Sequence, residues 1–149
     1  VEITPGVARL ALEAEPPQNF DVLVVDAFSG DAIPVHLLTR EVFALYLRHL
    51  RPGGVLAVHV SNQYLDLAPI VREIAARYNL PAVLVRTPDD DDELLDAADW
   101  VLLSRNRSFL ERKEVSGASA EIPLRPNLRM WTDAYYNLFQ VLKLVRGDR

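Results

Sequence analysis

The sequence predicts an α/β fold built on a partial doubly wound, mainly parallel sheet. Two observations predict it. Short, continuous apolar runs rich in β-branched residues alternate with segments whose apolar residues recur every three or four positions. Such runs are typical of strands buried on both faces, and such spacing is typical of helices with one apolar side. The order strand–helix–strand–helix–strand implies parallel strands joined by right-handed crossovers, with helices on the sheet faces.

The first strong strand signal follows a turn at Pro16-Pro17. There the segment Asp21–Asp26 encloses an uninterrupted apolar run between two carboxylates, which predicts a buried strand. Before the turn, residues 2–15 predict a short extended start and a weak helix over Val7–Ala14.

A helix is expected next, because Thr39 is a suitable N-cap for the segment that follows it. We expect this helix to close at Arg51 and to be ended by Pro52-Gly53-Gly54. Its apolar side would consist of residues at helical spacing: Val42, Phe43, Tyr46, Leu47 and Leu50.

The alternation then repeats. Val55–Val60 predicts a second buried strand, and Asp66 can cap a second helix that tolerates Pro69 in its first turn. Asn79 suits the exit of that helix. The apolar side of the helix would again be one stripe: Leu67, Ile70, Val71, Ile74, Ala75 and Tyr78.

The remainder of the chain predicts two more strands, Ala82–Val85 and Trp100–Leu103. Residues 115–129 contain glycine and prolines and predict a long irregular connection. Apolar spacing over Ala134–Val145 predicts a final helix.

Length and composition fit one domain over residues 1–149. The chain is 50% hydrophobic, which excludes wholesale disorder, and it has no cysteine, which excludes disulfides and thiolate chemistry. A net charge of −5 argues against binding nucleic acid through phosphate neutralisation. No apolar run approaches the roughly 18 residues of a membrane span, so we expect no membrane contact by this segment. The expected location is cytoplasmic, and a membrane-associated parent chain is compatible with it. Because residue 1 is Val, we expect a piece of a longer chain.

Five consecutive acids, from Asp89 to Glu93, carry as much negative charge as the whole chain has in excess. The simpler interpretation of this acidic run is a solvated loop. The alternative is a surface that attracts a polycation such as a polyamine. Three histidines, His36, His49 and His59, have no metal-ligand spacing, so no metal site is expected. His59 is interpreted as a core histidine within its strand.

The chemistry is expected at the carboxyl ends of the first two strands, because ligands of open parallel sheets bind outside those ends. Asp26 and Asp31 follow the first strand, and Ser61-Asn62 follow the second. A carboxylate at such an edge can accept a proton from an attacking amine or pair with an ammonium ion. The alternative stays open that Asp26 caps backbone amides and that Asp31 forms an Asx-turn. The G-x-S-x-G nucleophile elbow of hydrolases is absent around Ser29, because Ala27 occupies the position of the first glycine.

Two blocks resemble a known family. The segment Asp21–Val71, with DAFSGDAIP from Asp26 and HVSN from His59, is similar to spermidine synthase-like proteins, which are polyamine aminopropyltransferases. The segment Trp131–Leu138 resembles the closing WTDDYSNL motif of the bacterial branch that is often fused to a membrane transporter-like region. The resemblance implies an S-adenosylmethionine methyltransferase-like, Rossmann-like fold, of which these residues are the later half and the first half is missing.

The resemblance also implies roles. Asp26 would orient and deprotonate the attacking amine of a diamine such as putrescine, and Asp31 would hold its far ammonium. Ser61, Asn62 and Tyr64 would line the substrate cleft. Gly6 would belong to a Gly-Asp pair at the adenine end of the cosubstrate, decarboxylated S-adenosylmethionine. No tightly bound cofactor is implied.

At several positions the sequence departs from the family pattern, and these departures lead to two functional hypotheses. Val7 replaces the aspartate of the Gly-Asp pair, and Ala134 and Tyr136 replace an aspartate and a serine of the closing motif. The chain is therefore expected to be the amine-side part of an aminopropyltransferase, inactive alone, or a non-catalytic ligand-binding or assembly module descended from one. With the first half missing, the apolar strand Asp21–Asp26 would have an uncovered edge, which predicts a homodimer.

Overall fold

The computed structural model describes residue 3 and residues 5–26, 35–88 and 97–143, and Asp31 and the acidic run Asp89–Glu93 lie outside these residues. The described chain forms one sheet with strand order β1-β2-β4-β3-β5. The strands are, in sequence order, β1 (Phe20–Val25), β2 (Leu50–His59), β3 (Ala82–Thr87), β4 (Ala98–Ser104) and β5 (Ser119–Ala120). The expected α/β class is confirmed.

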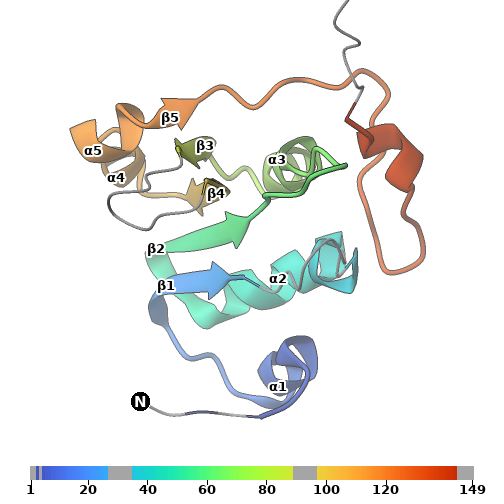
Figure 1. Ribbon diagram of the computed structural model, residues 1–149. Helices are drawn as coiled ribbons and strands as arrows, with labels where there is room; N and C mark the ends of the chain where they lie inside the picture. Colours follow the sequence, from blue (N-terminus) through green and yellow to red (C-terminus); the bar gives the residue numbers. More distant parts are fainter. Residues whose placement is uncertain (1–2, 4, 27–34, 89–96, 144–149) are drawn as a thin grey trace, which may run out of the picture.

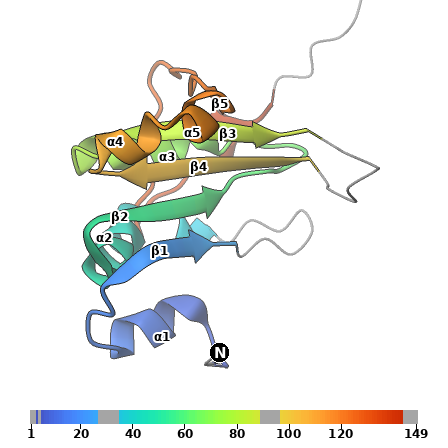
Figure 2. The same ribbon diagram turned by 90° about the vertical axis from the view of Figure 1, so that its left-hand side faces the viewer.

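Helices lie on both sides of this sheet (Figures 1 and 2). Helices α2 (Arg40–His49) and α3 (Ala68–Arg77) cover one face, and the short α4 (Arg107–Leu110) and α5 (Lys113–Ser116) lie toward the other, near β3 and β4. The first helix, α1 (Ala8–Ala14), lies beyond β1 at the end of the sheet. Two short 3₁₀ helices complete the set, η1 (Val35–Leu37) and η2 (Leu138–Val141).

The sheet is mixed, which corrects the expectation of a mainly parallel one. Strands β1 and β2 pair in parallel, but β4 lies antiparallel between β2 and β3, and β5 pairs antiparallel with β3. Only residues 88–97 separate β3 from β4. A parallel crossover needs a dozen or more residues, so the chain returns directly and pairs antiparallel.

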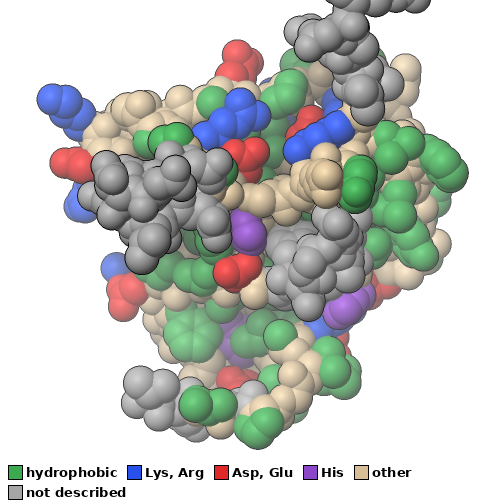
Figure 3. Space-filling view, viewed as in Figure 1, with side chains coloured by type: hydrophobic (Ala, Val, Ile, Leu, Met, Phe, Trp, Pro, Cys, Tyr) green, Lys and Arg blue, Asp and Glu red, His purple; other side chains and the backbone are tan. Residues whose placement is uncertain are grey.

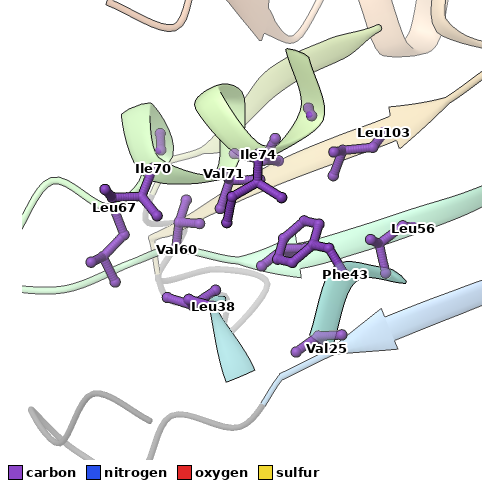
Figure 4. Close-up of a cluster of buried hydrophobic side chains, with 14 of the residues drawn as sticks. Val25, Leu38, Phe43, Leu56, Val60, Leu67, Ile70, Val71, Ile74 and Leu103 are labelled. Carbon is purple, nitrogen blue, oxygen red and sulfur yellow. The ribbon is translucent and has the colours of Figure 1, made fainter. Parts of the chain in front are cut away.

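The core lies between the sheet and helices α2 and α3 (Figure 4). Phe43 of α2, Ile74 of α3 and Leu56 of β2 are fully buried there. Phe43 and Ile74 belong to the two apolar stripes that predict the helices. This packing holds the carboxyl ends of β1 and β2 next to each other.

Helix α2 begins as expected and ends earlier than expected. The Thr39 hydroxyl accepts a hydrogen bond from the Val42 amide at 3.4 Å, which confirms the N-cap. The helix ends at His49, and residues 51–54 belong to β2 instead of stopping the helix. At Gly54 a Cβ would lie 2.9 Å from the Phe20 carbonyl oxygen, so glycine here permits β2 to approach the start of β1.

Helix α3 begins at Ala68 without a side-chain cap, so the expected Asp66 cap is wrong. The Asp66 carboxylate instead accepts a hydrogen bond from Arg125 at 3.1 Å. Pro69 lies in the first turn, and Asn79 takes a left-handed conformation with φ of 52° at the exit, as expected.

The expected final helix over Ala134–Val145 is wrong for its described part, where only Leu138–Val141 forms a 3₁₀ turn. The segment forms backbone hydrogen bonds with residues 64–66, including Lys143 N to the Tyr64 carbonyl at 2.8 Å. These bonds replace those of a helix. The long connection over 115–129 is irregular as expected, except that it contains the end of α5 and all of β5.

Asp133 ties the C-terminal segment to two helices. Its carboxylate accepts two hydrogen bonds from Arg9 of α1, at 2.8 and 2.6 Å, and one from the Thr39 hydroxyl at 2.7 Å. The bond from Arg9, supported by that from Thr39, lowers the pKa of Asp133 from 3.8 to about 2. A charged Asp133 is therefore part of the folded structure.

Replacing Asp133 by Asn is expected to lower the free energy of unfolding at pH 7 by roughly 1–2 kcal/mol, since 42% of the side chain is exposed and solvent screens the pair. The native pKa lies below the unfolded one, so this stability is complete above about pH 4 and disappears as pH falls through about 2. Urea unfolding across pH 2–7 measures it. Glu13→Gln is the control, because Glu13 also bonds Arg9 but at an exposed i,i+4 position worth a few tenths of a kcal/mol. A wild-type advantage that is as large at pH 2 as at pH 7 would contradict the assignment.

Candidate functional site

Asp26 directly follows β1 at the carboxyl edge of the parallel pair. Residues Val25 and Val58 are register partners, so the next residues, Asp26 and His59, lie side by side. His59 Nδ1 is 2.8 Å from Asp26 Oδ1. The Asp26 side chain remains 54% exposed. Within the described parts of the chain, which exclude the adjoining residues 27–34, His59 is the hydrogen-bonding partner found for this carboxylate.

His59 is held on its other side by the second predicted loop and by β4. Its Nε2 is 2.8 Å from the Ser61 hydroxyl, and the same hydroxyl oxygen accepts the Asp99 amide at 2.7 Å. The imidazole stacks on Trp100, with ring centroids 4.7 Å apart and planes 19° from parallel. These contacts arise because β2 and β4 pair with His59 opposite Trp100.

Two hollows lie beside this cluster. Asp26 lines an apolar hollow of about 320 Å³ between α1 and β1, together with Ala8, Leu12 and Tyr46. The Ser61 loop lines a polar hollow of about 380 Å³ with Asp99. Figure 3 shows hydrophobic side chains gathered over the part of the molecule where α1 and β1 lie. An apolar wall next to an open carboxylate suits a ligand with a cationic end and a hydrocarbon stem.

Asn62 and Tyr64 are both expected at the substrate cleft, and Asn62 lines the polar hollow together with Ser61. The Asn62 side-chain oxygen accepts the amides of Tyr64 at 3.0 Å and Leu65 at 2.8 Å, so it closes its own turn. Tyr64 is 57% exposed. Lys143 reaches the same loop and donates from Nζ to the Asn62 carbonyl at 2.6 Å. Of the three residues expected to line the cleft, Ser61, Asn62 and Tyr64, the structure connects Ser61 to Asp26 through His59.

Gly6 precedes α1 with φ of 146°, and a Cβ there would meet nothing within 4 Å. It does not line the hollow beside Asp26, whereas Ala8 does. Val7, which follows Gly6, is 53% exposed and has no hydrogen-bonding side chain. The residues present at this position therefore do not fit a nucleoside.

The order carboxylate, imidazole, hydroxyl is also that of nucleophilic triads. In such a triad the hydroxyl is free to attack, whereas the Ser61 oxygen accepts a backbone amide of β4. The hydrogen bonds of this arrangement therefore connect the backbone of β4, through Ser61 and His59, to the Asp26 carboxylate. Among the described residues no three His, Cys, Asp or Glu side chains cluster as metal ligands.

His59 and Trp100 are the site residues that sequence reasoning missed. The sequence favours a core histidine at His59, because this residue lies within an apolar strand. The available signal was its position as the last residue of a strand parallel to β1, which places it at the same edge as Asp26. The partnership of Trp100 depends on the antiparallel insertion of β4, which the sequence did not indicate.

No family model matches the sequence. A "probable polyamine aminopropyl transferase" of Bifidobacterium longum is 37% identical over 43 residues, which are 29% of this chain and 10% of that protein. The crystal structure of a "probable spermidine synthase" from Corynebacterium glutamicum matches with a TM-score of 0.52 and 22% identity. That match covers 87% of this chain and 56% of that chain, so the present chain spans only part of each relative. It supports the expected methyltransferase-like fold. No helix in the described residues is long and apolar enough to cross a membrane.

Proposed function

We propose that this chain, which resembles the spermidine synthase-like family, is the amine-binding part of a domain that transfers an aminopropyl group to a diamine such as putrescine. The observation that carries the proposal is the Asp26 carboxylate. It lies at the carboxyl edge of the sheet, 54% exposed, with one oxygen held by His59 and an apolar hollow beside it. The match to a probable aminopropyl transferase supports the same chemistry.

In this reaction an amine nitrogen attacks a carbon bonded to the sulfonium of decarboxylated S-adenosylmethionine. The C–N bond forms, the C–S bond breaks, and the attacking nitrogen loses a proton. Asp26 would orient the amine and accept that proton at Oδ2, the oxygen that His59 does not hold. The apolar hollow would take the methylene stem of the diamine. We assign no described residue to the cosubstrate, so the chain alone is expected to bind amine without turnover.

Calorimetric titration tests this proposal. Putrescine is expected to bind the purified chain, and butylamine, which has one ammonium group instead of two, is expected to bind more weakly. Methylthioadenosine, which carries the nucleoside part of the cosubstrate, is expected not to bind. If neither amine binds, the proposal fails and the alternative stands, a non-catalytic module descended from the same family.

We also propose that the chain forms a homodimer through β1. This strand lies at the end of the sheet, and its Val22 and Val24 side chains are 54% and 55% exposed. These two alternate residues share one face of the strand, and a second copy that packs against this face would bury them.

Light scattering over a dilution series is expected to show a dimer for the wild type and a monomer for Val22→Lys. Leu124→Lys is the control, because Leu124 is 69% exposed but lies in the irregular connection away from β1. A wild type that is monomeric at all concentrations would refute this assembly, and so would a Leu124→Lys variant that dissociates equally.

A further inference from the structure

We propose that His59 is a positioning residue that holds Asp26 in the orientation needed for amine binding, with Ser61 as the support of the imidazole. This inference rests on the proposed function and changes the expected role of Ser61. Its oxygen is engaged by the Asp99 amide and by His59 Nε2, so it supports the site instead of contacting substrate.

The hydrogen bonds determine which nitrogen of His59 carries the proton. Asp26 Oδ1 belongs to an ionised carboxylate, which only accepts hydrogen bonds, so Nδ1 must be the donor. In the tautomer with its proton on Nδ1, Nε2 is an acceptor, and Ser61 donates to it. The Ser61 oxygen still has a lone pair for the Asp99 amide at 2.7 Å. In this series of hydrogen bonds, from the Asp99 amide through Ser61 and His59 to Asp26, each donor therefore has an acceptor. The opposite tautomer of His59 would direct a lone pair of Nδ1 at the carboxylate.

The position of the ring is fixed independently of these bonds. His59 stacks on Trp100 at 4.7 Å, and its side chain is only 20% exposed. By contrast, the Asp26 side chain is 54% exposed and follows the last residue of β1. Without a fixed donor, this carboxylate could rotate freely in solvent. The bond at Oδ1 removes that freedom, which lowers the entropy cost of binding an amine.

Two substitutions separate the donor from the ring. His59→Phe retains a ring that can stack on Trp100 but removes the donor to Asp26. His59→Asn loses the ring but places an amide N–H near the position of Nδ1. Putrescine affinity is expected to fall about tenfold in His59→Phe and to recover in part in His59→Asn. Thermal unfolding of both variants shows whether each is folded, so a loss of affinity can be assigned to the donor.

A nuclear magnetic resonance measurement tests the geometry without substrate. Long-range proton–nitrogen correlations of the wild type are expected to show His59 protonated at Nδ1, and this preference is expected to be lost in Asp26→Ala. Protonation at Nε2 alone in the wild type would overturn the inference. So would wild-type putrescine affinity in a folded His59→Phe variant, although the proposed function would survive that result. If the wild type binds no putrescine, the proposed function fails and with it the positioning role, whatever tautomer is found.

Discussion

Replacing Asp26 by Asn is expected to abolish measurable putrescine binding by this chain. In a longer protein that contains these residues, it is expected to lower the rate of aminopropyl transfer by about 10²–10⁴-fold. Asparagine has nearly the same shape and retains an oxygen that can accept the bond from His59. It lacks the negative charge that pairs with an ammonium ion and the basic oxygen that takes the proton. The loss therefore reports on charge and basicity rather than on folding.

The matched control is Asp21→Asn. Asp21 lies on the same strand, near its other end, and forms an ion pair with Arg51. The substitution changes the net charge by the same amount, so a nonspecific electrostatic effect would weaken both variants equally. Calorimetry at low and high salt measures the putrescine affinity of both variants. Unchanged putrescine binding in Asp26→Asn would show that Asp26 is not part of the binding site. The proposed function would then lose the observation on which it rests.

Replacing Trp131 by Ala is expected to lower the free energy of unfolding by about 3–5 kcal/mol. Trp131 is the largest fully buried side chain, and it packs edge-on against Tyr136 with ring centroids 6.4 Å apart. Its carbonyl also accepts the Arg40 amide at 2.9 Å, where α2 begins. Removing the indole leaves a cavity where the C-terminal segment meets the core. Urea unfolding measures the loss if the dependence on urea concentration is the same in both proteins.

A second variant, Trp131→Phe, identifies the source of that energy. The indole Nε1 is buried and has no hydrogen-bond partner among the described residues, so its N–H contributes no bond that phenylalanine would lose. The cost should therefore be clearly smaller than that of Trp131→Ala, about 1–2 kcal/mol for the smaller cavity. Equal costs for the two variants would show that a polar contact of the indole, and not its volume, stabilises this region.

Much of the fold could be predicted from local pattern. The apolar runs predict β1 to β4, and the helical spacing with the Thr39 cap predicts α2, because burial periodicity and capping depend on neighbouring residues. The final helix could not be predicted in this way. Its apolar residues have helical spacing, but in the structure the backbone of Val141 and Lys143 bonds to residues 64–66, a partner 75 or more positions away in sequence.

Asp26 as the candidate carboxylate at a strand end could be read from the sequence, because a polar residue that terminates a buried apolar run must lie at the edge of the sheet. What surrounds Asp26 was decided by tertiary structure alone. Parallel pairing of β1 with β2 brings His59 to the carboxylate, and the antiparallel insertion of β4 brings Trp100 and the Asp99 amide to His59. Strand order and register arise from packing between distant segments, and a one-residue shift would turn each of these side chains to the other face of the sheet.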